Sequence, residues 1–109
     1  MLEALFGSVN RERVLLFLYV RKEGYSREIS RFFRTDLSQI QKQLERLEVG
    51  GTLYSRTLGK TRVYGLNPRY PFRVQLEALL DRALAFYPAE ERERLMMIRR
   101  RPRRKGKPL

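Results

Sequence analysis

The sequence predicts a mainly α-helical fold that carries one small β-hairpin, which places it in the α+β class. Apolar residues recur at helical spacing in several segments, and one short region is rich in β-branched and aromatic residues on both sides of a Leu-Gly-Lys turn. The 109 residues suffice for one modest core. We expect the main domain at 1–67, C-terminal helices at 68–98 and a basic disordered tail at 99–109.

The composition excludes several kinds of chemistry. The net charge is +12 and the pI about 10.9, so acidic partners are expected, nucleic acid first and an anionic membrane surface second. Neither cysteine nor histidine occurs, which rules out disulfides, thiolate or imidazole metal sites, and catalysis by Ser-His or Cys-His pairs. No pair of carboxylates forms a recognisable site, so we expect neither enzyme activity nor a cofactor.

The N-terminal segment predicts a buried helix. Residues 1–6 lack the basic start and long apolar run of a signal peptide, so we expect a cytoplasmic protein. Ser8 can cap a helix that runs to about Lys22, and Gly24 offers its C-terminal stop. The apolar run Val14–Val20 fits a buried strand or a buried helix, and the charged residues on both sides favour a helix, which is too short to span a bilayer.

The stretch from Ser26 to Leu47 predicts two helices joined by a tight turn. Ser26 can cap the first helix, and Arg34-Thr35 interrupts its pattern. Asp36 opens the second helix and fits a capping box with Gln39. The residues expected to be buried in the two helices are Ile29, Phe32, Phe33, Ile40, Leu44 and Leu47.

The second of these helices has a polar face without an apolar partner. Its members are Ser38, Gln41, Lys42 and Glu45, flanked by Gln43 and Arg46. Hydroxyl, amide and ammonium groups can hydrogen-bond base edges and phosphates in a major groove. Two helices around a short turn, the second with such a face, match the helix-turn-helix arrangement. The alternative is an ordinary amphipathic helix whose polar face meets only water.

The region from Thr52 to Leu66 predicts a β-hairpin with a basic tip. Leu58-Gly59-Lys60 supplies the turn between its two strands. Arg56, Lys60 and Arg62 lie near that tip, where they can reach a DNA backbone or a minor groove. The alternative is a hairpin that its charges merely keep soluble.

Several short motifs, taken in order, resemble winged-helix regulators of the ArsR-like type. They are Leu5-Phe6-Gly7-Ser8, Arg27-Glu28-Ile29, Leu44-Glu45-Arg46-Leu47, the Gly50-Gly51 stop and Asn67-Pro68 after the hairpin. The resemblance covers roughly Leu5 to Tyr87. It implies a winged helix-turn-helix fold and a dimeric, repressor-like protein that binds double-stranded DNA, with the Asp36–Glu48 helix in the major groove. Metal sensing does not transfer, because the cysteine and histidine ligands of the family are missing.

The resemblance and the basic faces together give a set of candidate DNA-binding residues. The set is Arg27, Arg34, Thr35, Ser38, Gln39, Gln41, Lys42, Arg46, Arg56, Lys60 and Arg62. Two positions depart from the family. Arg34 stands where glycine is usual in the turn, so it must adopt an unfavourable backbone or shift the turn. Asp36 puts a carboxylate near the place where a phosphate would sit.

The segment Tyr70–Tyr87 predicts a long amphipathic helix with Pro71 in its first turn. Its wide apolar stripe needs a partner, so we expect a homodimer. The candidate interface is Leu2, Leu5, Phe6, Phe72, Leu76, Leu79, Leu80, Ala83, Leu84 and Tyr87. The alternative is that the stripe folds back onto its own domain.

The chain ends in a further short helix after Pro88 and a basic run. Residues 95–98 are candidates for the same dimer contact. Residues 99–107 contain seven positive and no negative charges, which fits an arm on nucleic-acid phosphates or a solubilising tail. Two other functions stay open: an RNA-binding protein that uses the same basic face, and a winged helix that docks onto another protein. The operator, the target genes and any small-molecule effector leave no signature in the sequence.

Overall fold

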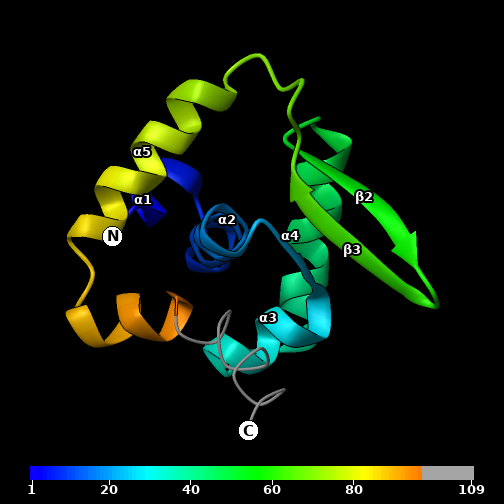
Figure 1. The fold of residues 1–109 in the computed structure, drawn as a ribbon, viewed down its shortest axis with the longest axis horizontal. Helices are drawn as coiled ribbons and strands as arrows, with labels where there is room; N and C mark the ends of the chain where they lie inside the picture. The colour runs from blue at the N-terminus through cyan, green and yellow to red at the C-terminus, as the bar shows by residue number, and fades with distance from the viewer. Residues whose placement is uncertain (97–109) are drawn as a thin grey trace, which may run out of the picture.

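A computed structural model describes residues 1–96 and shows six helices and a three-stranded antiparallel sheet in that range (Figure 1). The elements are α1 (Glu3–Phe6), α2 (Val9–Arg21), β1 (Glu23–Tyr25), α3 (Ser26–Phe33), α4 (Leu37–Val49), β2 (Leu53–Leu58), β3 (Thr61–Leu66) and α5 (Arg73–Ala85). Residues 89–96 form the sixth helix. The predicted α+β class is therefore confirmed, and the predicted basic tail lies outside the described residues.

Helix α2 forms the centre of the molecule. The apolar run Val14–Val20, whose pattern fits either a strand or a helix, is therefore helical. Ser8 caps it, as predicted, because its Oγ accepts the backbone N–H of Arg11 at 3.2 Å. Every residue from Val14 to Leu18 is buried. Successive residues of a helix point in directions about 100° apart, so α2 must be covered on all sides. Figure 1, which looks along α2, shows the other elements around it.

The end of α2 differs from the prediction. Lys22, with φ of 77°, follows the last helical residue, and Gly24 lies in β1 and does not stop the helix. Gly24 is needed there for another reason, since a Cβ at this position would lie 2.6 Å from a ring carbon of Phe17. Strand β1 was not predicted at all.

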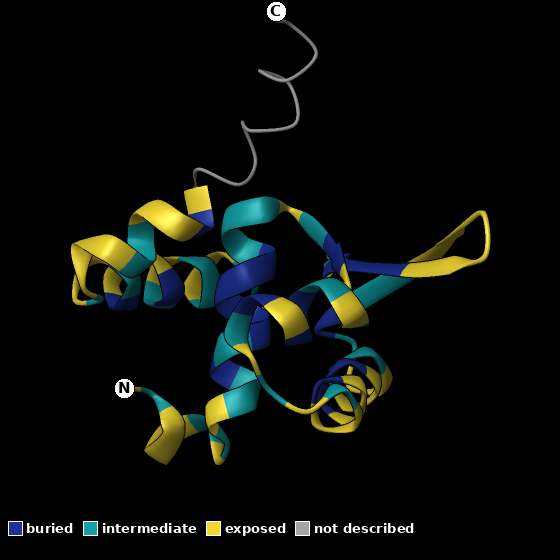
Figure 2. Ribbon diagram, turned by 90° about the horizontal axis from the view of Figure 1, so that it is seen from below, coloured by how far each residue is buried: buried dark blue, intermediate teal, exposed yellow. Residues whose placement is uncertain are grey.

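The predicted hairpin is confirmed, and β1 extends it to a sheet with the order β1-β3-β2. Gly65 of β3 stands between Glu23 of β1 and Tyr54 of β2. Gly59 makes the turn with φ of 65°. The base of the hairpin packs against the core through Leu53 and Tyr64, and Figure 2 shows the exposed tip projecting from the body.

Helices α3 and α4 and the turn between them occur where the sequence predicted them, but the caps differ. Tyr25 and not Ser26 precedes α3, and the Tyr25 N–H donates to the Glu28 carboxylate at 3.3 Å. Asp36 precedes α4, yet its carboxylate caps no backbone N–H and instead accepts the hydroxyl of Ser38 at 2.9 Å. The predicted capping box with Gln39 is therefore wrong.

The two C-terminal helices pack on the same core. Leu80 of α5 and Leu95 of the 89–96 helix both belong to the buried cluster around α2. Arginine–carbonyl hydrogen bonds hold the last helix in place, from Arg21 Nε to the Leu95 oxygen at 2.7 Å and from Arg94 to the Phe32 oxygen at 2.9 Å. Leu95 is thus an interior residue and not part of a dimer contact. Helix α5 begins at Arg73, so Pro71 lies just before it and not in its first turn.

None of the helices between residues 1 and 96 has the length and apolar character needed to cross a membrane.

Candidate nucleic-acid interface

Helix α4 has one buried and one exposed side. Ile40, Gln43 and Leu44 face the interior. The exposed residues are Ser38, Gln39, Gln41, Lys42, Glu45, Arg46 and Val49. At 100° per residue, Ser38, Lys42, Glu45 and Val49 form the middle row of this exposed side. We call the exposed side, defined by these seven residues, the outer face of α4.

Gln43 was expected beside this face but lies beneath it. Its side chain is 5% exposed, and its amide oxygen accepts the Arg11 Nε at 2.9 Å. The same guanidinium donates to the carbonyl oxygen of Phe6 at 2.9 Å. One arginine of α2 therefore ties α4 to the end of α1, which fixes the outer face relative to the core.

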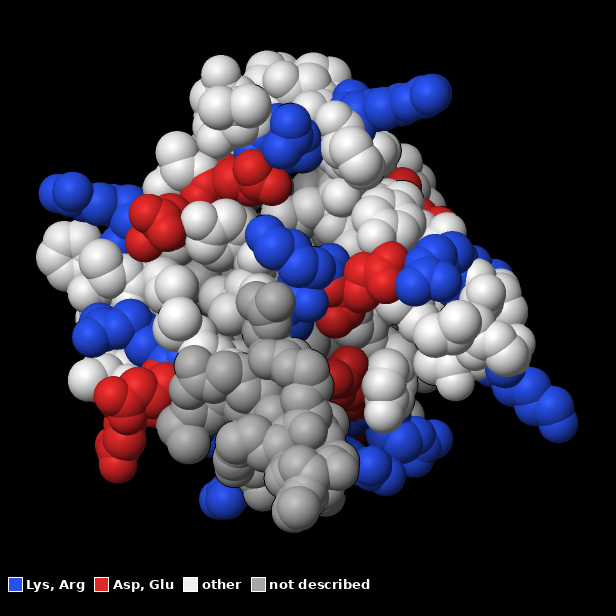
Figure 3. All heavy atoms as spheres, viewed as in Figure 1, with Lys and Arg blue, Asp and Glu red and all other residues white. Residues whose placement is uncertain are grey.

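The outer face carries little net charge. Its seven residues include two cations, Lys42 and Arg46, and one carboxylate, Glu45, and the adjacent Asp36 and Glu48 make the whole stretch from Asp36 to Val49 slightly negative. Figure 3 shows that positive and negative side chains also alternate over the molecular face that it displays. Electrostatic attraction to a polyanion must therefore come mainly from cations outside α4.

Three arginines on α3 and at its C-terminal end provide such cations. Arg27 and Arg31 stand at i and i+4 on α3, and Arg34 is the residue that follows the helix; all three are exposed, and we call them the arginine row. Within residues 1–96, none of their guanidinium groups has a hydrogen-bond or ion-pair partner. Arg27 and Arg34 are among the residues expected from the sequence, whereas Arg31 is not, although its spacing of four residues from Arg27 is visible in the sequence. Arg34 has φ of 53° and ψ of 50°, the unfavourable left-handed backbone that the sequence implied.

Arg56 is expected from the sequence to contact DNA from the hairpin, and the structure shows that it also has a partner within the chain. Its guanidinium makes two hydrogen bonds to the Glu23 carboxylate, at 2.9 and 2.6 Å, and the Tyr54 hydroxyl donates to the same carboxylate. The hydrogen bonds from Arg56 and Tyr54 outweigh the effect of burial and lower the pKa of Glu23 to about 2. The charge of Arg56 is thus neutralised where it stands.

Lys60 and Arg62 remain as exposed cations of the hairpin. Arg62 donates to the Ser55 hydroxyl at 2.8 Å, and that hydroxyl donates to the Glu48 carboxylate of α4 at 2.6 Å. This chain of hydrogen bonds links the hairpin to the end of α4. Thr35, the candidate phosphate contact at the start of α4, is half-buried, and its hydroxyl lies 3.5 Å from the Asn10 amide oxygen.

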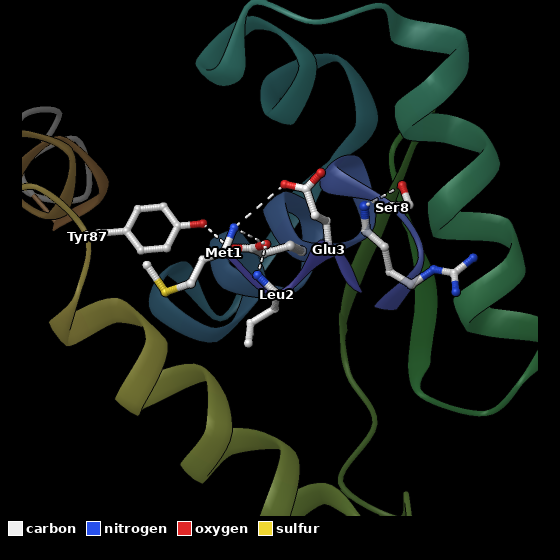
Figure 4. Close-up of polar contacts among 7 residues, drawn as sticks. Met1, Leu2, Glu3, Ser8 and Tyr87 are labelled. Atoms are coloured by element: carbon white, nitrogen blue, oxygen red, sulfur yellow. Dashed lines mark hydrogen bonds and ion pairs between the residues drawn. The ribbon is translucent and has the colours of Figure 1, made fainter. Parts of the chain in front are cut away.

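The N-terminal end of α2 carries a buried acid that joins distant segments. Glu12 is 2% exposed and accepts the Leu2 N–H at 2.7 Å, the Met1 ammonium at 3.3 Å and the hydroxyl of Tyr87. Figure 4 shows Tyr87 and the first residues converging on this point. Burial raises the pKa of Glu12, but the hydrogen bonds from Tyr87 and Leu2 outweigh it and leave the pKa below its usual value. Burial and the bond to Glu12 raise the pKa of Tyr87.

The structure divides the candidate dimer residues between the interior and the surface. Leu80 and Ala83 are buried within the chain, which removes them from any contact with a second copy. Phe6, Leu76, Leu84 and Tyr87 are half-buried and pack against the core. Leu5 and Phe72 are exposed, and Leu2 and Leu79 are partly so. The apolar stripe of α5 thus serves the chain's own core in large part.

Residues 1–96 contain no group of three or more Asp, Glu, His or Cys side chains that could hold a metal ion. No protein-family model matches the chain, and no curated protein matches its sequence significantly.

Proposed function

We propose that this protein binds double-stranded DNA in a sequence-specific way and regulates transcription, acting as a repressor by occupying its site. In this proposal α3, the turn and α4 form a helix-turn-helix, and the β2–β3 hairpin is its wing. The observation that carries the proposal is the outer face of α4, where Gln41 and Lys42 are exposed and the underlying helix is fixed by Leu44 and Gln43. Amide and ammonium groups on a rigid helix can read base edges in the major groove.

The exposed cations support the same geometry. The arginine row lies on α3 and in the turn before α4, and Lys60 and Arg62 lie on the hairpin that follows α4. The outer face has a low net charge and lies between two basic elements. In this arrangement the cations of those elements neutralise phosphates, while α4 selects the base sequence. This division explains how α4 can carry Asp36, Glu45 and Glu48 in a protein that binds a polyanion.

A homodimer is the second part of the proposal. Phe72 and Phe86 flank the two ends of α5, seven residues before and after Leu79, and both phenylalanines are exposed. Apolar residues at this spacing lie along one edge of a helix and suit pairing with a second helix. We call these three residues the α5 seam. The α5 seam replaces the wider interface expected from the sequence, because the buried residues of that set already pack in the core of the same chain.

Selection of bound duplexes from a random pool tests the proposal. We expect a selected site with two-fold symmetry, whose half-sites lie one helical turn apart, roughly 34–36 Å. Structured RNA at the same salt concentration should compete poorly with the selected duplex. Enrichment of no duplex, or stronger binding to RNA, would overturn the DNA-binding function.

A further inference from the structure

The acidic residues at the start of α4 and along it differ in whether another side chain donates a hydrogen bond to their carboxylates. Asp36 accepts the Ser38 hydroxyl at 2.9 Å, and Glu48 accepts the Ser55 hydroxyl at 2.6 Å. Glu45 is exposed in the middle row of the outer face, and within residues 1–96 no hydrogen bond or ion pair engages its carboxylate. Among these three residues, Glu45 is therefore the one whose carboxylate is left to accept a hydrogen bond from a base.

A free carboxylate at this place restricts what α4 can bind. Like charges that face each other across an interface cost several kcal/mol, so Glu45 disfavours any placement against phosphates. The cost is offset only where a hydrogen-bond donor meets the carboxylate. In the major groove, cytosine N4 and adenine N6 are donors, but the N7 acceptor beside adenine N6 repels a carboxylate. Cytosine is therefore the base that a carboxylate can contact favourably in the major groove.

Lys42 is placed to contact the other base of the same pair. It stands one turn before Glu45 in the same row, and side chains at i and i+3 have Cβ atoms about 5–6 Å apart. Within the described chain the two residues form no ion pair with each other. An ammonium group can donate to the O6 and N7 atoms of guanine, the base that pairs with cytosine.

We propose that Glu45 determines specificity by accepting a hydrogen bond from cytosine N4, while Lys42 donates to guanine, so that the two residues read a G·C pair in each half-site. This inference rests on the proposed function of the protein. It also gives Glu45 a second effect, which is to weaken non-specific binding by repelling the DNA backbone.

The test compares duplex selection by the unaltered protein, Glu45→Gln and Glu45→Ala. The unaltered protein should require cytosine at one position of each half-site. Glu45→Gln should shift that preference toward adenine, because glutamine bonds N6 and N7 together. Glu45→Ala should lose the preference and bind non-specific duplex more tightly. The matched control is Glu93→Gln, which makes the same change of charge on an exposed residue of the last helix and should alter no base preference.

A chemical substitution in the DNA tests the contact itself. N4-methylcytosine keeps its base pair but presents a methyl group in place of the free N4–H in the major groove. At the selected position it should weaken binding by the unaltered protein roughly tenfold and leave binding by Glu45→Ala unchanged.

The possible failures are distinguishable. If the protein selects a duplex and none of the Glu45 variants changes its base preference, the role of Glu45 is wrong and the proposed function stands. If the protein selects no duplex, both the function and the role of Glu45 fall.

Discussion

At the scale of single residues, Arg34 shows a conflict between stability and binding. The left-handed conformation that Arg34 adopts costs a residue with a Cβ roughly 1–2 kcal/mol of conformational free energy. We expect Arg34→Gly to raise the free energy of unfolding by up to about 1 kcal/mol and to weaken duplex binding, because a cation of the arginine row is lost. Urea unfolding and a binding titration on the same preparation measure both effects.

Lys22 provides the control for Arg34. It also has positive φ, 77°, but lies at the end of α2. Lys22→Gly should raise stability without the loss of affinity. If both variants lost affinity equally, Arg34 would contribute only to the overall positive charge and would make no specific contact with DNA.

The Glu23–Arg56 pair makes stability depend on pH. The pKa of Glu23 is lowered from 4.5 to about 2 in the fold, so its stabilisation is complete above about pH 5 and is lost as the pH falls from 4.5 toward 2. The two side chains are 30% and 49% exposed, so solvent screening keeps the effect small. Glu23→Gln should therefore be less stable than the unaltered protein at pH 7, and this difference should shrink at pH 3. A difference that stays constant between the two pH values would contradict this account.

At the scale of elements, the base of the hairpin depends on Gly65. The Tyr54 ring crosses Gly65 to reach Glu23, and a Cβ at Gly65 would lie 2.6 Å from the Tyr54 hydroxyl. We expect Gly65→Ala to destabilise the protein by about 1–3 kcal/mol through this clash, measured by urea unfolding. In a Tyr54→Ala background the same substitution should cost much less, because the obstructing ring is gone. An equal cost in both backgrounds would place its origin elsewhere.

The elements also show what the sequence can and cannot predict. Periodicity located α2, α3, α4 and the hairpin, because each has a strong local pattern. Strand β1 has three residues, too few for any pattern, and exists because β3 offers it an edge. The salt bridge of Arg56 joins residues 33 positions apart, so no local rule could show that its charge is neutralised.

The outer face of α4 was more predictable than the dimer surface. The polar positions of α4 alternate with its apolar stripe, so the exposure of Gln41 and Lys42 followed from the helical period. An apolar stripe does not reveal whether its own chain or a second chain covers it. Leu80 and Leu79 look alike in the sequence, yet one is buried and the other lies partly at the surface.

At the scale of the whole molecule, the α5 seam is expected to join two copies. Leu79→Lys should convert the dimer into a monomer that still folds, because it places a charge in the seam and spares the core. Val74→Lys is the matched control, since Val74 is exposed on another side of α5 and its substitution should leave the dimer intact. Sedimentation equilibrium measures both masses. A monomer mass for the unaltered protein at all concentrations would rule out the seam.

The central claim is that the outer face of α4 reads duplex DNA, and the most direct measurement is the affinity ratio between a selected and a scrambled duplex at fixed salt. Gln41→Ala should reduce this discrimination by roughly 1–3 kcal/mol, whereas Gln75→Ala, on the exposed side of α5, should leave it unchanged. A protein that binds both duplexes equally, or a Gln41→Ala variant with full discrimination, would contradict the claim.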